Sequence, residues 1–343
     1  MEKVVKLKDI KDEFSNSVDK IHDLCKNEIY DINQLITEKL ISNVKLVNEI
    51  ANYIFISGGK RLRPLITIAC SKMLGYGFKK DQIDHIDLAA AIEFIHTATL
   101  MHDDVVDESL LRRGNLSSNE IWGNKTSVLI GDFLFSRAFQ LMAKDKSGRV
   151  LKLLSDTSVT ISEGEVLELS YDKDPTLSEN EYLEVINGKT ASLFSASSQV
   201  AGNIAKIDRN KEEALKTFGK NFGMCFQLID DALDYSSSTQ NLGKNVGDDF
   251  KEGKITMPII LSYLRSDKME KKFWQRTIKN LNQKQGDFLK AKEIINKYNC
   301  IEDTILRAKH FSNIAIDSLG IFDDNKYKNS LLELVRGSLK RIK

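Results

Sequence analysis

The sequence predicts an all-α protein. Apolar residues recur at intervals of three and four over most of the chain, which is the spacing of one face of a helix. Only three prolines occur, Pro64, Pro175 and Pro258, so long helices can run without interruption. No segment of any length alternates apolar and polar residues as a half-buried strand does.

The charge balance of the chain excludes binding through overall charge. Lysine and arginine number 50 and the acids 49, which gives a net charge of +1. Such a chain has no general attraction for nucleic acid or for an anionic membrane, so any anion must bind at a local cluster of cations. No apolar run is long enough to span a bilayer.

The cysteines and the N-terminus predict a protein of a reducing compartment. The first 14 residues lack the apolar stretch of a secretory signal. The cysteines lie far apart in apolar helical patterns without the spacing of metal ligands, which favours free, buried thiols. We therefore expect a cytoplasmic location. The four residues concerned are Cys25, Cys70, Cys225 and Cys300.

Residues 1–56 predict amphipathic helices, followed by a basic turn. Residues 1–40 are expected to form a helical extension that packs on the domain or contacts a second subunit. Gly58 and Gly59 end this helical pattern, and Pro64 is suited to the first turn of the next helix. Lys60 and Arg63 lie between them, so cations gather at a helix N-terminus, where a phosphate-type anion can bind. The alternative is an ordinary basic surface turn.

The strongest chemical signal is a pair of acidic clusters. Residues 86–111 predict a helix, in which Asp103 and Asp107 lie four apart on one face, with Asp104 beside them. A single cluster of this kind is more often a solvated helix end. However, a second one recurs in the helix predicted over 212–235, which argues for a bound cation shared between the two. The second cluster consists of Gln227, Asp230, Asp231 and Asp234.

Further cations follow both clusters. Arg112 and Arg113 come directly after the first. Lys189 and Thr190 follow a predicted interruption at Asn187-Gly188 in the helix 179–200, where a bend can present both to a cavity. Residues 236–254 predict a polar loop of a length that is usually functional, and its lysines, Lys244 and Lys254, suit a lid over an anion. Residues 127–142, 150–170 and 259–343 predict further helices.

These pieces predict a site for two diphosphates. Clustered carboxylates suit Mg²⁺, which takes oxygen ligands from carboxylates and substrate phosphates. The cationic segments suit diphosphate oxygens, and apolar helix faces around them suit a hydrocarbon substrate. The sequence has neither a P-loop nor a dinucleotide-binding glycine pattern nor a nucleophile motif.

In combination, the motifs resemble those of trans-isoprenyl diphosphate synthases (the polyprenyl synthetase family), in particular its long-chain octaprenyl and decaprenyl members. The resemblance covers nearly all of the chain after about residue 40 and includes five motifs in order. These are GGKRLRP at 58–64, HTATLMHDDVVDESLLRRG at 96–114, GKT at 188–190, FQLIDDALDY at 226–235 and GKNVGDDFKEGKITMP at 243–258.

The resemblance implies a single-domain antiparallel helical bundle, residues 1–343, around a deep central cavity, with the following roles. The diphosphate of isopentenyl diphosphate is bound by Lys60, Arg63, His96 and Arg113. The allylic diphosphate is held by Arg112, Lys189, Thr190, Gln227, Lys244 and Lys254. Mg²⁺, three ions when the allylic diphosphate is present, is bound by Asp103, Asp107, Asp230 and Asp234. The catalytic residues are Asp103, Asp104, Asp107, Lys189, Asp230 and Asp231.

The implied reaction is chain elongation by five-carbon units. The metal-bound allylic diphosphate departs, the isopentenyl double bond attacks C1, and a proton is lost. In the family, residues like Ala98 and Thr99 form the floor that limits the growing chain, and both are small here. We therefore expect a C40 to C50 product, as used for ubiquinone or menaquinone side chains, made by a homodimer with peripheral membrane contact for product release.

Three alternatives remain at this stage. A class I terpene cyclase uses one aspartate motif and no isopentenyl diphosphate. A non-catalytic partner subunit of a heteromeric synthase would not need intact acids and cations. A short-chain farnesyl or geranylgeranyl diphosphate synthase would differ only in the floor residues.

Overall fold

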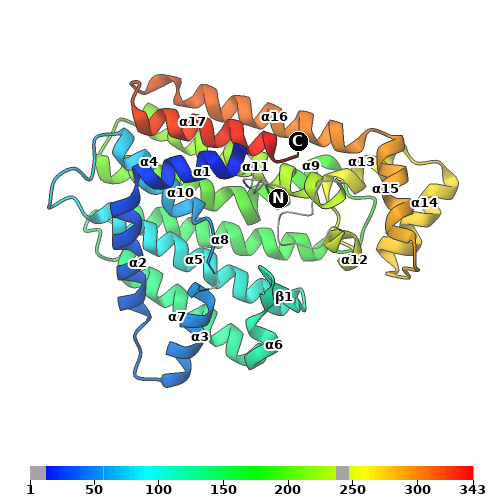
Figure 1. Ribbon diagram of the computed structural model, residues 1–343, viewed down its shortest axis with the longest axis horizontal. Helices are drawn as coiled ribbons and strands as arrows, with labels where there is room; N and C mark the ends of the chain where they lie inside the picture. Colours follow the sequence, from blue (N-terminus) through cyan, green and yellow to red (C-terminus); the bar gives the residue numbers. More distant parts are fainter. Residues whose placement is uncertain (1–12, 57, 237–246, 343) are drawn as a thin grey trace, which may run out of the picture.

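A computed structural model describes residues 13–56, 58–236 and 247–342, and Figure 1 presents it as an elongated bundle of helices. Its first half contains a short hairpin besides the helices. The elements are α1 (Glu13–Leu24), α2 (Lys26–Leu40), α3 (Lys45–Ile56), α4 (Leu62–Met73), α5 (Asp84–Val106), β1 (Leu111–Arg112), β2 (Asn115–Leu116), α6 (Ser118–Trp122), α7 (Asn124–Met142) and α8 (Arg149–Ser170).

The second half of the described chain is helical throughout. Its elements are α9 (Glu179–Ile186), the π-helical turn η1 (Asn187–Ala191), α10 (Ser192–Ala205), α11 (Arg209–Tyr235), α12 (Asp248–Glu252), α13 (Met257–Arg265), α14 (Lys268–Trp274), the π-helical turn η2 (Gln275–Lys279), α15 (Asp287–Lys297), α16 (Cys300–Ser318), the 3-10 turn η3 (Leu319–Ile321), α17 (Lys326–Ser338) and the 3-10 turn η4 (Leu339–Ile342).

Local sequence signals set several of these boundaries. The Ser178 and Asp267 side chains cap α9 and α14, and in each case a glutamate three residues later completes a capping box. Asp208 accepts a hydrogen bond from the Lys211 backbone and so caps α11. Pro258 lies in the first turn of α13, where its missing N–H leaves no hydrogen bond unmade.

The long helix α11 joins two parts of one hydrophobic core. Its first half contributes Phe218 and Phe222 to the core shared by α1, α2, α4, α5, α7, α8, α10 and α17. Its second half contributes Leu228 and Ala232 to the core under α9, α13, α14, α15 and α16. Because one continuous helix belongs to both parts, the described residues form a single all-α domain, as the sequence predicts. None of the described helices combines the length and the apolar character that a membrane span requires.

The N-terminal helices belong to this core. Phe14 and Ile21 of α1 are fully buried, and α1 packs along α17 at the other end of the chain. Figure 1 shows the two helices lying side by side. The predicted extension therefore contacts the domain itself over its described residues. Four buried free cysteines confirm the prediction for the thiols, and burial raises the pKa of the Cys225 thiol to about 11.

Two sequence predictions need correction. The helix predicted over 86–111 ends at Val106, because Glu108 and Arg113 adopt left-handed backbone conformations (φ 50° and 54°) that a helix does not contain. Residues 111–116 form a small antiparallel hairpin instead. The interruption predicted at Asn187 is a π-helical turn, so the chain stays helical from α9 to α10.

Candidate active site

The first acidic cluster lies at the C-terminal end of α5, and each of its carboxylates has a different cation. Asp104 is buried and accepts hydrogen bonds from Arg112, with the Nε atom 2.8 Å away. Asp107 lies 3.1 Å from the Lys254 Nζ atom, from the segment after α12. The arginine and the lysine thus join α5 to the hairpin and to the second half of the chain.

Asp103 is the acid of this cluster that the protein compensates least. Burial raises its pKa to about 6, Lys189 lowers it, and the neighbouring Asp107 raises it further. On the adjoining face of α8, burial raises the pKa of Glu165 to about 7 against the opposite effect of Lys189. A raised pKa means that the ionised form lacks sufficient positive charge nearby, which is the condition that a bound cation relieves.

Two glycines, Gly164 of α8 and Gly188 of η1, bring Lys189 to these acids. A Cβ atom on Gly164 of α8 would lie 2.6 Å from the Lys189 backbone nitrogen, so α8 and η1 touch backbone to backbone at this point. The contact sets the Lys189 ammonium group 2.8 Å from Glu165 and 2.6 Å from Glu168. These acids outweigh the effect of burial and raise the pKa of Lys189.

The second acidic cluster lies on α11 and is held by a chain of hydrogen bonds. Thr190 of η1 donates to the Gln227 side chain (3.0 Å), and Gln227 donates to Asp231 (2.9 Å). The Tyr182 hydroxyl of α9 donates to the other Asp231 oxygen. Asp231 is nevertheless buried, and burial raises its pKa to about 7.

The other two acids of this cluster, Asp230 and Asp234, contact other segments. The Asp230 carboxylate lies 2.6 Å from Arg341, in the last turn of the described chain. The Arg341 side chain is 9% exposed and stacks over the Phe226 ring at 4.8 Å. Asp234 accepts backbone hydrogen bonds from Gly247 and Asp249, both 3.2 Å long, and thereby fixes the start of α12.

The basic turn at the start of α4 contacts α5. Arg63 donates to the His96 Nε2 atom at 3.2 Å, and its guanidinium lies over the Phe194 ring. Burial lowers the pKa of His96 well below its usual value, with Arg63 and Arg113 acting in the same direction, so the imidazole is neutral. Arg113 lies against Gly59, where a Cβ atom would be 2.6 Å from the guanidinium.

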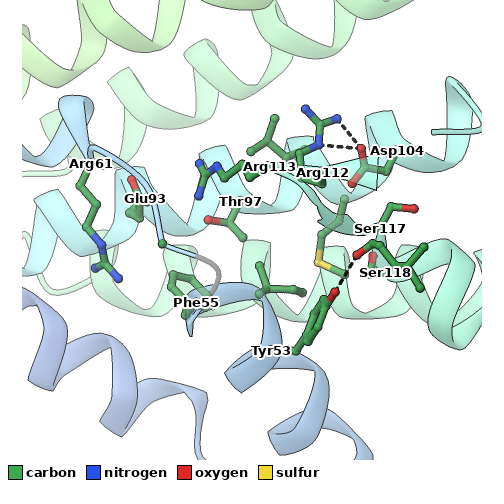
Figure 2. A pocket seen from close by; sticks show the side chains of 15 residues that line it. Tyr53, Phe55, Arg61, Glu93, Thr97, Asp104, Arg112, Arg113, Ser117 and Ser118 are labelled. Atoms are coloured by element: carbon green, nitrogen blue, oxygen red, sulfur yellow. Dashed lines mark hydrogen bonds and ion pairs between the residues drawn. The ribbon is translucent and has the colours of Figure 1, made fainter. Parts of the chain in front are cut away.

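A pocket opens beside this turn, between α3, α5 and the hairpin. Figure 2 shows the Arg61, Arg113 and Glu93 side chains lining it, with the Arg112–Asp104 ion pair at the other end. Glu93 is buried, and burial raises its pKa although Arg61, Arg63 and Arg113 lower it. The three arginines are thus partly neutralised by one carboxylate.

The two predicted floor residues differ in position. Thr99 lies one turn before Asp103 on α5, is partly exposed, and donates a hydrogen bond to the His96 carbonyl (2.8 Å). Ala98 is fully buried in the main core.

The structure brings most of the predicted residues into one region, at the ends of α5 and α11 and around η1 and the basic turn. Lys60 lies at that turn, over the Phe14 ring at 4.5 Å. Lys244 lies outside the described residues. Sequence reasoning assigned no role to five residues that complete the region, although the α8 acids form a visible cluster in the sequence. They are Glu93, Glu165, Glu168, Tyr182 and Arg341.

The carboxylate oxygens of this region suit a magnesium ion that is also bound by the substrate. Among the described residues, no three His, Cys, Asp or Glu side chains are grouped closely enough to hold a metal ion by themselves. Carboxylates on two separate helices, three of them with raised pKa values, suit a hard cation that takes its remaining ligands from phosphate oxygens. Fold and site together define an enzyme of the all-helical isoprenoid synthase class.

Comparison with known proteins agrees. The sequence model of the polyprenyl synthetase family matches residues 44–295. The octaprenyl diphosphate synthase of Haemophilus influenzae is 38% identical over 326 residues, which cover 95% of this chain and 97% of that protein. The chain belongs to the polyprenyl synthetase family and is therefore a trans-prenyltransferase.

Solved structures support the same assignment. A polyprenyl synthase from Caulobacter crescentus, complexed with calcium and isoprenyl diphosphate, is 44% identical with a TM-score of 0.90, covering 95% of this chain and 98% of that one. A decaprenyl diphosphate synthase from Rhodobacter capsulatus is 40% identical with a TM-score of 0.90, covering 95% and 99%. Members of this family in general depend on Mg²⁺ and use isopentenyl and allylic diphosphates.

Proposed function

We propose that this protein condenses an allylic diphosphate with successive isopentenyl diphosphates to give a long all-trans polyprenyl diphosphate of C40 to C50. The observation that carries the proposal is the presence of two acidic clusters with raised pKa values, on α5 and α11, together with two groups of cations. One group lies at the basic turn and the other lies against acids of the site. Two cation groups around one pair of clusters suit two diphosphates, and hence two substrates. The long-chain relatives support the product length.

The isopentenyl diphosphate binds at the basic turn. Its diphosphate contacts Lys60, Arg63 and Arg113, of which Arg63 and Arg113 lie near the neutral His96. A neutral imidazole donates one hydrogen bond to a phosphate oxygen without adding charge. Because burial lowers the pKa of Arg63 to about 10, an incoming anion stabilises a guanidinium that is otherwise costly to bury.

The allylic diphosphate binds between the clusters. Its oxygens contact cations and hydrogen-bonding groups from four places: the hairpin, η1, α11 and the segment after α12. Lys189 and Lys254 already lie against acids of the site, so their charge is in place before the substrate arrives. The set is Arg112, Lys189, Thr190, Gln227 and Lys254, with Lys244 of the same predicted lid.

The carboxylates that would hold Mg²⁺ are Asp103, Asp107, Asp230 and Asp234. Magnesium bound there, as three ions with the allylic substrate, would neutralise charge on the departing diphosphate. Asp104 and Asp231 position this set, since each is fixed by a side-chain partner, Arg112 or Tyr182. In the free protein, the positive charge of Arg341 neutralises the Asp230 carboxylate.

The reaction then proceeds in three steps: cleavage of a C–O bond, formation of a C–C bond and loss of a proton. The C1–O bond of the allylic substrate breaks and leaves an allylic cation, whose lost diphosphate is held by Lys189 and Arg112. The double bond of isopentenyl diphosphate, oriented by the basic turn, attacks C1 and forms a carbon–carbon bond. A proton of the resulting cation passes to the departed diphosphate, and the chain is five carbons longer. Thr99, small and on the Asp103 face of α5, leaves room for the growing tail.

The assembly that fits this chain is a homodimer joined through α7 and α8. These helices expose large apolar side chains to solvent in a single copy, where they have no packing partner, and exposed apolar area of this kind favours association. Glutamate in place of Leu129 and Val159 should give a monomer by light scattering. The exposed residues are Val128, Leu129, Phe139, Leu151, Val159 and Val166.

The direct test is incubation of the purified protein with Mg²⁺, labelled isopentenyl diphosphate and an allylic primer, followed by sizing of the extracted product. The expected result is incorporation into products of C40 to C50 for quinone side chains. Consumption of the allylic primer without isopentenyl incorporation would instead indicate a cyclase, and C15 or C20 products a short-chain synthase. A folded protein with no incorporation would contradict the proposal.

A further inference from the structure

The helical hairpin formed by α14, η2 and α15 concentrates positive charge on an otherwise acidic chain. Residues 268–297 contain nine lysines and arginines and three acids, a net charge of +6. The whole chain has a net charge of +1, so the remainder is net negative by five charges. Figure 1 shows the hairpin at one end of the long axis of the molecule, beside α12 and α13.

Two of the three acids of the hairpin are paired with its own cations. Arg276 forms two hydrogen bonds with Asp287 (2.7 and 2.8 Å), and Lys297 lies 2.7 Å from Glu270. Trp274 is fully buried and anchors the hairpin to Ser266. Within the described part of the chain, the other seven cations have no carboxylate at ion-pair distance. They are Lys268, Lys271, Lys272, Lys279, Lys284, Lys290 and Lys292.

Apolar side chains stand among these lysines on the exposed surface. Met269 on α14 and Leu289 on α15 are 73% and 66% exposed. The aromatic rings of Phe273 and Trp274, by contrast, are buried. A basic surface with protruding aliphatic groups suits an anionic lipid surface, whereas single-stranded nucleic acid is bound by exposed aromatic rings on which its bases stack.

The hairpin also contacts the segment that brings Lys254 to the candidate active site. Its turn contacts α12, because Gln283 donates a hydrogen bond to the Phe250 carbonyl (2.6 Å). Leu281 lies against Gly253, where a Cβ atom would be 2.6 Å from its side chain. The next residue, Lys254, forms the ion pair with Asp107. A surface that docks the hairpin therefore lies close to the segment whose Lys254 reaches the first acidic cluster.

We propose that the exposed lysines and aliphatic residues of the α14–α15 hairpin dock this protein on a bilayer containing anionic phospholipid. The inference rests on the proposed function in one respect, since the hydrocarbon product gives the enzyme a reason to meet a bilayer. Each lysine near such a surface contributes to binding, and the attraction extends only about 10 Å at moderate salt. The aliphatic side chains enter the interface and make the contact specific for lipid.

The experiment measures co-sedimentation of the full chain with vesicles. Phosphatidylcholine vesicles are compared with vesicles in which about one-third of the lipid is phosphatidylglycerol. We expect binding to the anionic vesicles only, weakened by salt. The triple variant Lys272→Glu/Lys279→Glu/Lys290→Glu should bind at least about tenfold more weakly.

A matched control variant changes the net charge equally at exposed lysines elsewhere, Lys125→Glu/Lys146→Glu/Lys220→Glu. It should keep most of the vesicle binding. Equal losses in the two triple variants would overturn the proposal, as would tighter hairpin-dependent binding to a single-stranded oligonucleotide than to vesicles. If the glutamate variant does not fold, the variant Lys272→Gln/Lys279→Gln/Lys290→Gln replaces it. This variant should also bind the anionic vesicles more weakly than the parent protein.

The double variant Met269→Ser/Leu289→Ser tests the contribution of the exposed aliphatic side chains. It should bind vesicles more weakly, and its binding should remain sensitive to salt. Prenyl transfer in detergent is measured on the same preparations and should be unchanged in all variants. Absence of prenyl transfer in the unaltered protein would contradict the proposed function alone, because vesicle binding is measured independently of turnover.

Discussion

The Arg341 guanidinium lies 2.6 Å from the Asp230 carboxylate, so the last turn of the described chain neutralises an acid of the second cluster. Arg341 is mostly buried, between the rings of Phe14 and Phe226. Among the described residues, its Nε and Nη1 atoms have no hydrogen-bond partner. A buried guanidinium with free donors, beside an acid that we propose binds Mg²⁺, can release that acid and turn to a substrate oxygen.

The first prediction follows from competition for Asp230. In Arg341→Met, the carboxylate loses its cation, so Mg²⁺ no longer has to displace an arginine. We expect the Mg²⁺ concentration for half-maximal activity to fall, and the metal-free protein to lose about 1–2 kcal/mol of unfolding free energy, since Asp230 is only partly exposed. Metal titrations of activity and denaturant unfolding measure the two effects.

The neighbouring Lys340→Met serves as the control. Lys340 is exposed and pairs with Glu13 at the surface, so its loss should leave the Mg²⁺ requirement unchanged. An identical requirement in the Arg341 variant and the parent protein would refute the competition.

The contrast between Arg341 and the aspartates illustrates how far the sequence predicts this site. Asp103 and Asp107 are four residues apart on one helix, and local spacing alone places them together. The pair of Asp230 and Arg341 depends on how α11 and the C-terminal turn pack, and no local pattern encodes it. The same holds for Tyr182 and Asp231, on different helices. The helical fold was predictable because its signal is periodic and local, whereas the hairpin after α5 depends on single residues with left-handed backbone.

The second prediction concerns pH. Asp231 and Asp103 have raised pKa values, about 7 and about 6, so the folded state binds their protons more tightly than the unfolded chain does. Their contribution to stability therefore increases as pH falls through 7 and 6, and is complete below about 4, the ordinary aspartate pKa. The Tm of the metal-free protein should include a component that rises from pH 8 to pH 5.5.

Asp231→Asn isolates that component. The amide cannot ionise, so the variant should lose part of the pH dependence of Tm and keep the part due to Asp103. Added Mg²⁺ should raise Tm more at pH 8 than at pH 5.5, because it stabilises the ionised acids. A variant with the same Tm profile as the parent protein would show that Asp231 does not titrate as the structure indicates.

The third prediction concerns the backbone contact that positions Lys189. In Gly164→Ala, the new methyl group would lie 2.6 Å from the Lys189 nitrogen, so η1 must move away from α8. A shift of about 1 Å at a lysine that we propose holds the leaving diphosphate should lower kcat by about 10²-fold. Gly320→Ala is the control, since nothing lies within 4 Å of a Cβ atom there. Equal activity of the two variants would argue against a role for this contact.

The fourth prediction separates the two floor residues by their burial. Thr99 is partly exposed on the Asp103 face of α5, so a phenylalanine can occupy the path of the tail without disturbing the core. Thr99→Phe should shorten the product by several isoprene units while condensation continues. Ala98 is fully buried, and Ala98→Phe should cost about 1–3 kcal/mol of stability through overpacking in addition to any change of length. Thr99→Val keeps the size of the side chain and should leave the product unchanged. Sizing the extracted products and measuring Tm together distinguishes the two positions: a Thr99→Phe enzyme that still makes the parent product would place the limit of chain length elsewhere in the bundle.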